Sequence, residues 1–446
     1  MSRTIFALAT PPGRSGVAVI RVSGSAAGDA LDAVAGTPRP ASRVATLRRL
    51  RTAMGETIDT SLLLWFPGPN SFTGEDMAEF HVHGGPAVIQ DMVDRLGELP
   101  GLAPADAGEF TRRAFHNGKL DLTEVEGLAD LIDAETSAQR RQARRQLDGR
   151  LSRAIDHWRE RLIRTQAHLE AAIDFSDEDL PDHLMDQAGG EIRALAGEID
   201  AMLADNRAGE RLRGGLSLAI LGAPNAGKSS LLNALARREA AIVADTAGTT
   251  RDVVEVHLDV GGYPVSVADT AGLRALADDV DAIEQEGIRR ALARARQADL
   301  KLALFDATAP EGPDAATAEL VDDDTIVVAT KADRIATVPL ASIGDRPMVA
   351  VSATTGHGMD GLLSELETAI AARFDTGGEA AAITRERHRA ALTETRDALE
   401  RAQQAQLPEL AAEDLRLATR ALGRITGAVD VEDLLDVIFR DFCIGK

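Results

Sequence analysis

A glycine-rich stretch that ends in a lysine and a serine is the part of this sequence best suited to bind phosphate. It runs Gly222, Ala, Pro, Asn, Ala, Gly227, Lys228, Ser229, and it has the spacing of a P-loop. The glycines let successive backbone N–H groups converge on phosphate oxygens, while Lys228 supplies a positive charge and Ser229 a Mg²⁺ ligand. A hydrophobic run precedes the loop and a helical pattern follows it, as a P-loop requires.

Two downstream segments would complete a triphosphate-dependent switch. Thr250 lies in a glycine- and threonine-rich loop, where its hydroxyl can complete Mg²⁺ coordination when the γ-phosphate orders that loop. Asp269 follows a hydrophobic strand and can hold Mg²⁺ through water, and the Gly272 N–H can meet the γ-phosphate. We therefore expect a nucleoside triphosphate as the ligand.

The choice of base is predicted from Thr330, Lys331, Ala332 and Asp333, because a carboxylate at a strand end can accept both N1–H and the exocyclic amine of guanine. This segment resembles the Asn-Lys-x-Asp motif of GTPases, and Ser352 with the following alanine resembles its companion loop. Thr330 stands where asparagine is usual. A hydroxyl replaces only some amide hydrogen bonds, so we expect GTP affinity to be lower by about 1 kcal/mol.

Hydrolysis needs a group that orients water, and the position used by small signalling GTPases is Leu273, which has no polar side chain. Candidates lie downstream, between residues 278 and 287. Arg251 and Arg274 lie close to the switch segments in sequence. A monovalent cation is the alternative source of positive charge, with Asn225 and carbonyl groups of residues 244–249 as ligands; Asn225 otherwise only caps the loop.

Composition indicates a folded protein of about two to four domains, with 446 residues of which 44% are hydrophobic. No apolar run approaches the roughly 18 residues of a membrane span, and the N-terminus lacks a signal-peptide pattern, so we expect a cytoplasmic protein. Cys443 is the only cysteine, which excludes an intrachain disulfide. Its position near the end mimics a prenylation signal, but the residues after it do not fit one.

A formal charge of −22 argues against nonspecific nucleic-acid binding, but the local distribution of charge differs from the total. Between residues 139 and 164 there are nine arginines against only Asp148, Asp156 and Glu160. The run is either a solvated helix face, as charge runs usually are, or a basic face for RNA phosphates.

Hydrophobic periodicity divides the chain into four segments. Strand patterns at 16–22 and 61–66 predict a mixed α/β domain, and a second α/β segment carries strand patterns at 216–221, 253–260, 263–268, 300–305, 325–329 and 348–351. His81 and His83 share one side of a strand, where we expect packing or hydrogen bonding. The segments are 1–118 (α/β), 119–213 (helical), 214–376 (nucleotide-binding α/β) and 377–446 (helical, ending in FCIGK).

The whole chain resembles the MnmE (TrmE) family of tRNA-modification GTPases. The resemblance rests on ATPPGRSGVAVIRVSG at the start, PNSFTGEDMAEFHVHGGP, GEFTRRAFHNGKLDLTEVEGLADLI, the GTPase motifs and the terminal FCIGK, in this order. It implies a folate-binding-type N-terminal domain for dimerisation, and a helical domain into which a Ras-like P-loop GTPase domain is inserted. Such proteins form homodimers and, with an FAD-containing partner (MnmG or GidA), install a carboxymethylaminomethyl or aminomethyl group at C5 of the tRNA wobble uridine.

The resemblance also implies ligands and roles. A 5-formyl-tetrahydrofolate-type cofactor is expected at Arg21, Glu79, Lys119 and Lys446. K⁺ is expected at Asn225, Ala244, Thr246 and Thr249, and Mg²⁺ at Ser229 and Thr250. Glu284 is the expected water-orienting residue, with Glu286 as a rival, and Lys228 and Arg274 complete the catalytic set. The expected GTP contacts are Asn225, Ala226, Gly227, Lys228, Ser229, Ser230, Ala244, Asp245, Thr246, Ala247, Gly248, Thr249, Thr250, Asp269, Thr270, Ala271, Gly272, Thr330, Lys331, Ala332, Asp333, Ser352, Ala353 and Thr354.

Two other classes of function remain open from the sequence. One is a slow GTPase switch that binds RNA in ribosome assembly or signalling. The other is a folate-dependent transferase that the GTPase regulates. Three observations separate these functions from tRNA modification. They are the presence of the modified wobble nucleoside, the accumulation of ribosomal precursors, and one-carbon transfer that does not depend on the nucleotide.

Overall fold

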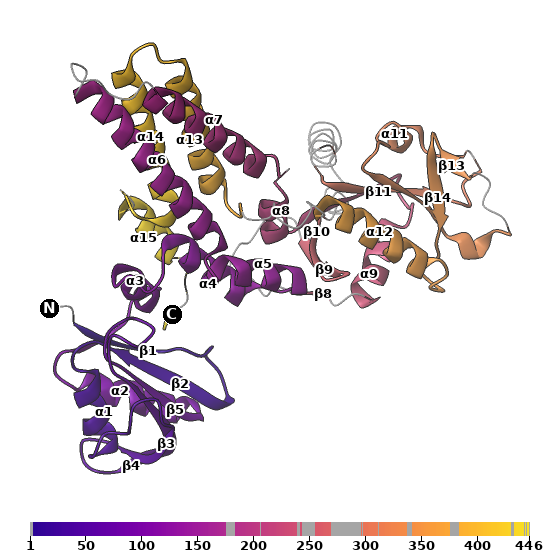
Figure 1. The fold of residues 1–446 in the computed structure, drawn as a ribbon. Helices are drawn as coiled ribbons and strands as arrows, with labels where there is room; N and C mark the ends of the chain where they lie inside the picture. The colour runs from indigo at the N-terminus through magenta and orange to yellow at the C-terminus, as the bar shows by residue number, and fades with distance from the viewer. Residues whose placement is uncertain are drawn as a thin grey trace, which may run out of the picture. The chain divides into compact units, whose positions relative to one another are not determined.

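The computed structural model places most of the chain in two units, each with a β-sheet and helices (Figure 1). Unit 1 comprises residues 1–129, 146–188 and 404–446, and unit 2 comprises residues 130–145 and 189–403. In the part of the chain that is described, no helix has both the length and the apolar character needed to cross a bilayer. The described residues are 3–174, 183–205, 207–238, 241–242, 255–268, 296, 298–310, 312–336, 341–374, 383–429, 432–440, 442 and 444–445.

The sheet of unit 1 has six strands: β1 Thr4–Leu8, β2 Ser15–Ser23, β3 Thr46–Arg51, β4 Thr57–Phe66, β5 Met77–Gly84 and β6 Leu102–Pro104. Their order is β3-β4-β5-β2-β1-β6, and only the pair of β1 and β6 is parallel. The strands predicted at 16–22 and 61–66 are confirmed within β2 and β4.

One face of this sheet is covered by helices α1 Ala27–Ala35 and α2 Pro86–Gly97, which share a hydrophobic core with it. Ile20 of β2 and Phe80 of β5 are cross-strand partners and are fully buried in that core. Side chains alternate along a strand, so the neighbouring partners Arg21 and Glu79 project from the opposite face. Strand alternation therefore places the two candidate folate residues together, away from the core.

The helices wholly or mainly in unit 1 are α3 Glu109–His116, α4 Leu122–Asp133, α6 Arg150–Asp174, α14 Pro408–Thr426 and α15 Glu432–Arg440. Helix α6 packs along α14. The C-terminal tail returns to the N-terminal sheet: Ile444 forms a β-bridge with Ala107, and a Cβ on Gly445 would lie 2.3 Å from the Leu8 carbonyl oxygen. Only glycine fits this contact, which explains one residue of the FCIGK tail.

Unit 2 contains the helices α5 Ser137–Leu147, α7 His183–Leu203, α8 Ala208–Gly214 and α13 Glu386–Gln404. The helical patterns predicted in 119–213 and after 377 are thereby confirmed. Asp130 Oδ1 accepts hydrogen bonds from Arg213 (2.9 Å) and Arg385 (2.8 Å), residues that flank the nucleotide-binding segment. Mixed α/β sheets and helices are present as predicted, while the exact domain boundaries and the insertion remain predictions.

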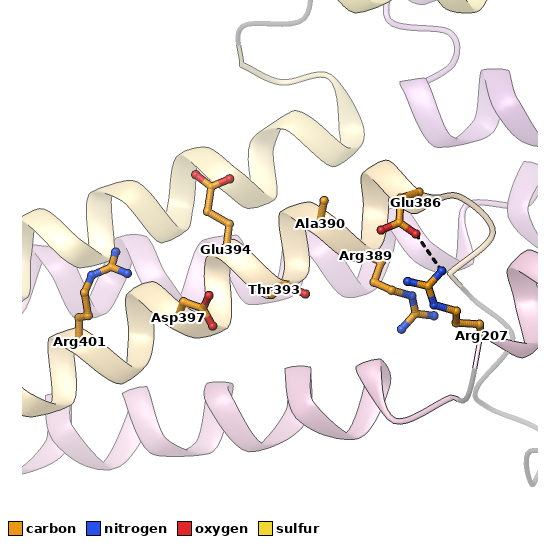
Figure 2. A pocket seen from close by; sticks show the side chains of 8 residues that line it. All are labelled: Arg207, Glu386, Arg389, Ala390, Thr393, Glu394, Asp397 and Arg401. Atoms are coloured by element: carbon orange, nitrogen blue, oxygen red, sulfur yellow. Dashed lines mark ion pairs between the residues drawn. The ribbon is translucent and has the colours of Figure 1, made fainter.

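An ion-paired junction connects α7, α8 and α13. Arg389 of α13 donates hydrogen bonds to the Leu203 carbonyl (3.1 Å) and to Asp205 (2.6 Å), whose side chain is fully buried. Burial alone would lower the pKa of Arg389, but its bonds to Asp205 and the charge of Glu210 raise the pKa more strongly. Figure 2 shows Arg207 reaching Glu386 (3.3 Å) at the end of a cavity of about 490 Å³ that continues along α13.

The sheet of unit 2 has eight strands in the order β13-β14-β12-β11-β7-β10-β9-β8. The pairs from β14 to β10 are parallel, and both edges are antiparallel. Gly261 and Gly262, both with positive φ, form a two-residue hairpin between β9 and β10. The elements are β7 Leu216–Gly222, α9 Lys228–Arg238, β8 Ala241–Ile242, β9 Glu255–Val260, β10 Tyr263–Ala268, β11 Leu300–Asp306, α11 Ala315–Ala318, β12 Thr325–Thr330, η2 Ala332–Arg334, β13 Ser342–Ile343, β14 Arg346–Ala350 and α12 Met359–Phe374.

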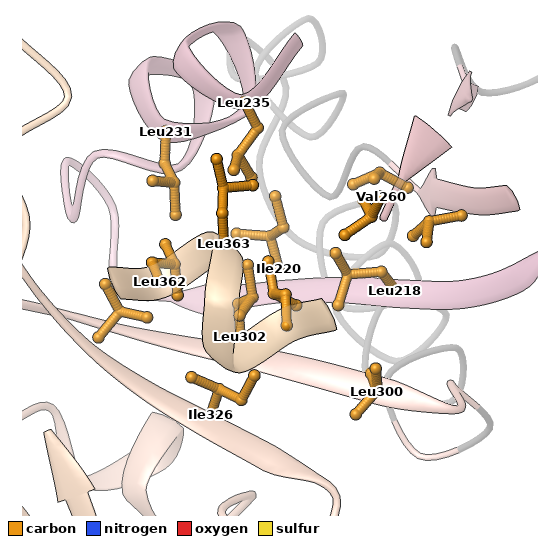
Figure 3. Packing of buried hydrophobic residues seen from close by; sticks show 14 of the residues in the cluster. Leu218, Ile220, Leu231, Leu235, Val260, Leu300, Leu302, Ile326, Leu362 and Leu363 are labelled. Atoms are coloured by element: carbon orange, nitrogen blue, oxygen red, sulfur yellow. The ribbon is translucent and has the colours of Figure 1, made fainter. Parts of the chain in front are cut away.

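The core of this sheet fixes the loop that follows β7. Figure 3 shows Leu218 and Ile220 of β7 packed with Leu231 and Leu235 of α9, and Leu362 of α12 in the same cluster. These side chains are at most 3% exposed. A strand and a helix anchored in one core hold the short connection between them in a defined position.

Candidate functional site

The connection between β7 and α9 has the backbone geometry that the P-loop motif predicts. Gly222, Asn225 and Gly227 all have positive φ, at 153°, 65° and 92°. A Cβ on Gly222 would lie 2.7 Å from the carbonyl oxygen of Leu304 on the neighbouring strand β11. Glycine is therefore required at residue 222 by both conformation and space.

Lys228 begins α9 and folds back over this loop. Its Nζ donates hydrogen bonds to the carbonyl oxygens of Gly222 (2.7 Å) and Ala223 (3.0 Å). The ammonium group is thus held above the loop, where the helix N-terminus also favours negative charge. Ser229 and Asn225 are exposed residues of this loop.

A cavity of about 120 Å³ lies beside the loop, at the carboxyl ends of β7, β12 and β14. This is the edge at which open parallel sheets bind ligands. It brings together the end of the P-loop, the Thr-Lys-Ala-Asp segment and the Ser-Ala-Thr segment. Its lining residues are Gly227, Ser230, Leu231, Thr330, Lys331, Asp333, Arg334, Val351, Ser352, Ala353 and Thr354.

Thr330, which replaces the usual asparagine, connects the base segment to the P-loop. Its side chain is buried, and Oγ1 donates to the carbonyl oxygen of Ala226 (2.7 Å) with a longer contact to that of Phe305 (3.2 Å). The hydroxyl thus supplies one of the hydrogen bonds expected of an asparagine amide.

Lys331 is held by a residue that the sequence reasoning missed. Its backbone is left-handed (φ 58°), and its Nζ donates to Asp306 Oδ2 at 2.5 Å. Burial alone would raise the pKa of Asp306, but hydrogen bonds from Lys331 and Thr308 lower it below its ordinary value. The sequence feature that could have identified this partner is an acidic residue at the end of β11, the strand that pairs with β12.

The loop after β12 is hydrogen-bonded to the loop after β14. The Ala332 N–H donates to the Val351 carbonyl (3.1 Å), and Ser352 Oγ accepts from the Thr355 N–H (3.2 Å). Asp333 itself is exposed, with its carboxylate at the cavity. The arrangement leaves this acceptor accessible to a planar base with two adjacent N–H donors.

Several predicted site residues lie outside the described residues. They are the loop Ala244 to Thr250, the segment Asp269 to Gly272, and Arg274, Glu284 and Glu286. Of the predicted Mg²⁺ and K⁺ ligands, only Ser229 and Asn225 are among the described residues, and both belong to the P-loop.

A second candidate site lies on the face of the unit 1 sheet opposite α1 and α2, where Ile5 and Met77 also share a small core with Phe110 of α3. Arg21 Nε donates to Glu79 Oε1 (2.9 Å), and the other oxygen of Glu79 is 3.2 Å from His81 Nε2. His83 Nδ1 is 2.8 Å from Asp59 Oδ1 on the neighbouring strand β4. Packing or hydrogen bonding was expected of these histidines, and both make hydrogen bonds. No group of three or more metal-ligating side chains occurs among the described residues.

Glu79 and Lys119 line one cavity of about 380 Å³. Lys119 Nζ donates to the Pro69 carbonyl (3.1 Å), at the edge of the quoted PNSFTGE segment. Sequence reasoning missed Arg43, whose guanidinium carbon is 5.6 Å from the centre of the Phe66 ring. An aromatic ring, a carboxylate and two cations around a cavity suit a flat, anionic ligand. Lys446 lies outside the described residues.

The fold and the nucleotide site define a P-loop nucleotide-binding protein of the GTPase type. Two family descriptions cover almost all of the chain: GTP-binding protein TrmE N-terminus matches residues 4–119, and MnmE helical domain matches residues 122–443. The chain belongs to the MnmE (TrmE) family of tRNA modification GTPases.

Similar proteins match along their whole length. A tRNA modification GTPase MnmE of Paramagnetospirillum magneticum is 58% identical over 446 residues, 100% of both chains. One of Rhodospirillum rubrum is 55% identical, with 99% of each chain covered. The mitochondrial 5-taurinomethyluridine-[tRNA] synthase subunit GTPB3 of Homo sapiens is 48% identical over 99% of this chain and 93% of its own.

Proposed function

We propose that this chain is the K⁺-activated GTP hydrolase of a cytoplasmic tRNA-modifying complex. It works as a homodimer with an FAD-containing partner (MnmG or GidA), and the complex forms 5-carboxymethylaminomethyl or aminomethyl uridine at the wobble position. The observation that carries the proposal is the cavity that joins the P-loop, the Thr-Lys-Ala-Asp segment and the Ser-Ala-Thr segment in a member of this family.

The described residues have separate tasks in binding GTP. Backbone N–H groups of the P-loop and the start of α9 bind the phosphates, and Lys228 exchanges its carbonyl partners for phosphate oxygens. Asp333 accepts from N1–H and the amine of guanine. Mg²⁺, when bound, neutralises charge between the outer phosphates; the exposed Ser229 hydroxyl is an oxygen donor of the type it prefers, with Thr250 as its expected partner.

For hydrolysis, we assign Glu284 to orient the water and K⁺ to supply the positive charge that an arginine finger supplies elsewhere. Asn225, with Ala244, Thr246 and Thr249, would hold K⁺. Support for Asn225 comes from its exposed position within the P-loop, at a left-handed φ of 65°. Arg274 is the remaining catalytic candidate, and Glu286 is the rival for the role of Glu284.

The experiment for this catalytic site is GTP hydrolysis in KCl and in NaCl at matched ionic strength. Asn225→Gly is the informative variant, because glycine keeps the φ of 65° without strain and removes only the side chain. We expect much faster turnover of the wild type in K⁺ and loss of that difference in the variant. Equal rates in both salts would reject K⁺ activation.

Glu284→Ala and Glu286→Ala, assayed side by side, assign the water-orienting role. We expect the first to abolish hydrolysis while sparing GTP binding, and the second to retain turnover. The reverse pattern would transfer the role to Glu286.

For the second site we propose a 5-formyl-tetrahydrofolate-type cofactor held by Arg21, Glu79, Lys119 and Lys446. The cavity beside Glu79 and Lys119 supports it, since a folate tail carries carboxylates and its ring is flat and rich in N–H donors. Calorimetric titration with 5-formyl-tetrahydrofolate should give binding that Lys119→Met weakens and that Arg164→Met, in α6, leaves unchanged.

Analysis of tRNA nucleosides separates this function from its two rivals. Deleting the gene should remove the modified wobble uridine, and expressing the chain should restore it. Normal nucleosides together with accumulating ribosomal precursors would favour an assembly GTPase. One-carbon transfer by the isolated chain without nucleotide would favour a folate-dependent transferase.

A further inference from the structure

Helix α5 carries an exposed row of arginines that has no role in the sites described above. Its buried side comprises Ala138, Gln142, Ala143 and Gln146. Its exposed side, here called the arginine face, comprises Arg140, Arg141, Arg144 and Arg145. The spacing of one and four residues places all four guanidinium groups on one side of about two helical turns.

Helix stability does not account for this face. Arg144 and Arg145 lie in the last turn, where the helix dipole favours cations. Arg140 and Arg141 lie near the first turn, where it disfavours them, and no acidic residue is present in that turn. Like charges four residues apart also repel each other, by roughly 0.2–0.5 kcal/mol per pair. Arg141 donates a hydrogen bond to Ser137 Oγ on the same helix (3.1 Å), but placing two arginines near this end of α5 still carries an electrostatic cost.

The other arginines of the same run differ from the arginine face. Helix α6 alternates them with acids: Arg164 pairs with Glu160 (3.5 Å), and Asp156 lies between Arg153 and Arg159. That pattern is the solvated helix face considered for the whole run. The formal charge of the whole chain is −22. Within residues 139–164, the exposed face that carries arginines without acidic residues between them is the one on α5.

One hydrogen bond attaches α5 to the nucleotide-binding segment, and two attach it to α8, which precedes that segment. The Ala138 N–H donates to the carbonyl of Gly262 in the β9–β10 hairpin (3.0 Å). The side-chain amides of Gln139 and Gln142 donate to the carbonyls of Arg213 (3.1 Å) and Gly209 (2.9 Å). Residues 130–145 accordingly belong to unit 2. The arginine face is thus carried by the unit that contains the nucleotide site.

We propose that the arginine face of α5 binds the phosphate backbone of the tRNA substrate. Guanidinium groups match phosphate oxygens in geometry and charge, and such contacts position an RNA without reading its sequence. The proposal rests on the proposed function for the choice of tRNA as partner. It adds that the contact belongs to the nucleotide-binding unit, so that tRNA is held by the part of the chain that also binds GTP.

The test compares two purified full-length variants with equal loss of charge. The first is R140Q/R141Q/R144Q/R145Q, and the control is R164Q/R401Q/R416Q/R420Q, in which exposed arginines of other helices are changed. Glutamine is as good a helix former as arginine, so both should fold, which thermal unfolding checks. Binding of an unmodified tRNA transcript is measured from 0.05 to about 0.3 M KCl, a range over which phosphate contacts change affinity strongly.

We expect the first variant to bind tRNA about tenfold or more weakly at about 0.1 M salt, with a slope of log affinity against log salt that is smaller by about 3. Its GTP hydrolysis without tRNA should be unchanged, and the control should bind like the wild type. Unchanged affinity and slope, equal loss in the control, or no tRNA binding by the wild type would each overturn the proposal. Restoration of the modified nucleoside in cells tests the proposed function separately, since it can succeed when the arginine face proves irrelevant.

Discussion

The base pocket of unit 2 and the pocket of unit 1 are built in different ways. The first consists of loops at the ends of parallel strands, and its shape depends on backbone conformations at Gly222, Asn225 and Lys331. The second lies against one face of a mainly antiparallel sheet, and Glu79, which lines it, is paired with Arg21 on the facing strand β2.

This difference determines what a substitution does in each pocket. In the loop-built pocket, a substitution that leaves the backbone conformation unchanged should have a large effect on ligand binding. Its effect on the stability of the fold should be small. In the sheet-built pocket, the polar pair sits between strands, so that binding and stability change together. The predictions below test this distinction.

Asp333→Asn should have the largest effect, and it should act on binding alone. Two hydrogen bonds from guanine to a charged acceptor are lost, at about 1.5–3 kcal/mol each, so GTP affinity should fall by roughly a hundredfold or more. Xanthosine triphosphate, which offers an acceptor in place of the amine, should bind the variant better than GTP. Calorimetry with both nucleotides measures the change.

The matched control is Asp345→Asn, an exposed aspartate outside the pocket. It should leave both affinities unchanged. The role of Asp333 would be rejected if its variant bound GTP like this control.

Arg21→Met should affect both stability and ligand binding. Glu79 is 15% exposed and would keep only His81 as a partner, so the free energy of unfolding of unit 1 should fall by about 1–2 kcal/mol. Denaturant unfolding measures this loss, and titration with 5-formyl-tetrahydrofolate measures binding.

The double variant with Glu79→Gln gives the coupling between the two side chains. It should lose less stability than the sum of the single changes. Strict additivity would mean that the pair contributes nothing as a pair, and the contrast between the pockets would then fail.

The local features of both pockets were predictable from the sequence, and their long-range contacts were not. The P-loop and the strand before it follow from glycine positions and a hydrophobic run within some 15 residues. The hydrogen bonds of Lys331 to Asp306 and of Thr330 to Ala226 join residues 25 and 104 positions apart. Such partners are chosen by the strand order of the sheet, which the motif does not contain.

The same reason explains why the contacts of Arg43 and Asp130 were not predicted. Arg43 stacks on Phe66 because β4 ends near it, and Asp130 binds two arginines that are 83 and 255 residues away. Composition identified these residues only as charged. The residue types that the sequence identified best are those whose role depends on backbone conformation, as in the loop-built pocket.

Thr330→Val should have a moderate effect on GTP affinity. It tests whether a change in the loop-built pocket affects binding more than the fold. Valine has nearly the same shape and removes the hydroxyl, so the Ala226 carbonyl loses its partner at a cost of about 1 kcal/mol. We expect GTP affinity about fivefold lower, with the fold retained. Thr330→Ser keeps the hydroxyl and should bind GTP like the wild type. Equal loss in both variants would point to packing rather than to the hydrogen bond.

The smallest effect concerns pH and the pair of Asp306 and Lys331. Although burial raises the pKa of Asp306, hydrogen bonds from Lys331 and Thr308 lower it below the ordinary value of 3.8. The stability that this carboxylate contributes is therefore complete above that value and is lost as the pH falls through the lower pKa of the folded state. Asp306→Asn should flatten this part of the stability profile, by less than about 1 kcal/mol.

Asp322→Asn is the comparison that decides whether Asp306 serves the fold or the site. The pKa of Asp322 is also lowered: burial raises it, but hydrogen bonds from Lys301 and Thr325 lower it more. Both variants should flatten acid unfolding, as followed by circular dichroism between about pH 2 and 6. Only Asp306→Asn should also weaken GTP binding, because it releases the lysine of the base segment. If both variants bind GTP equally well, Lys331 keeps its place without Asp306, and the backbone alone maintains the loop-built pocket.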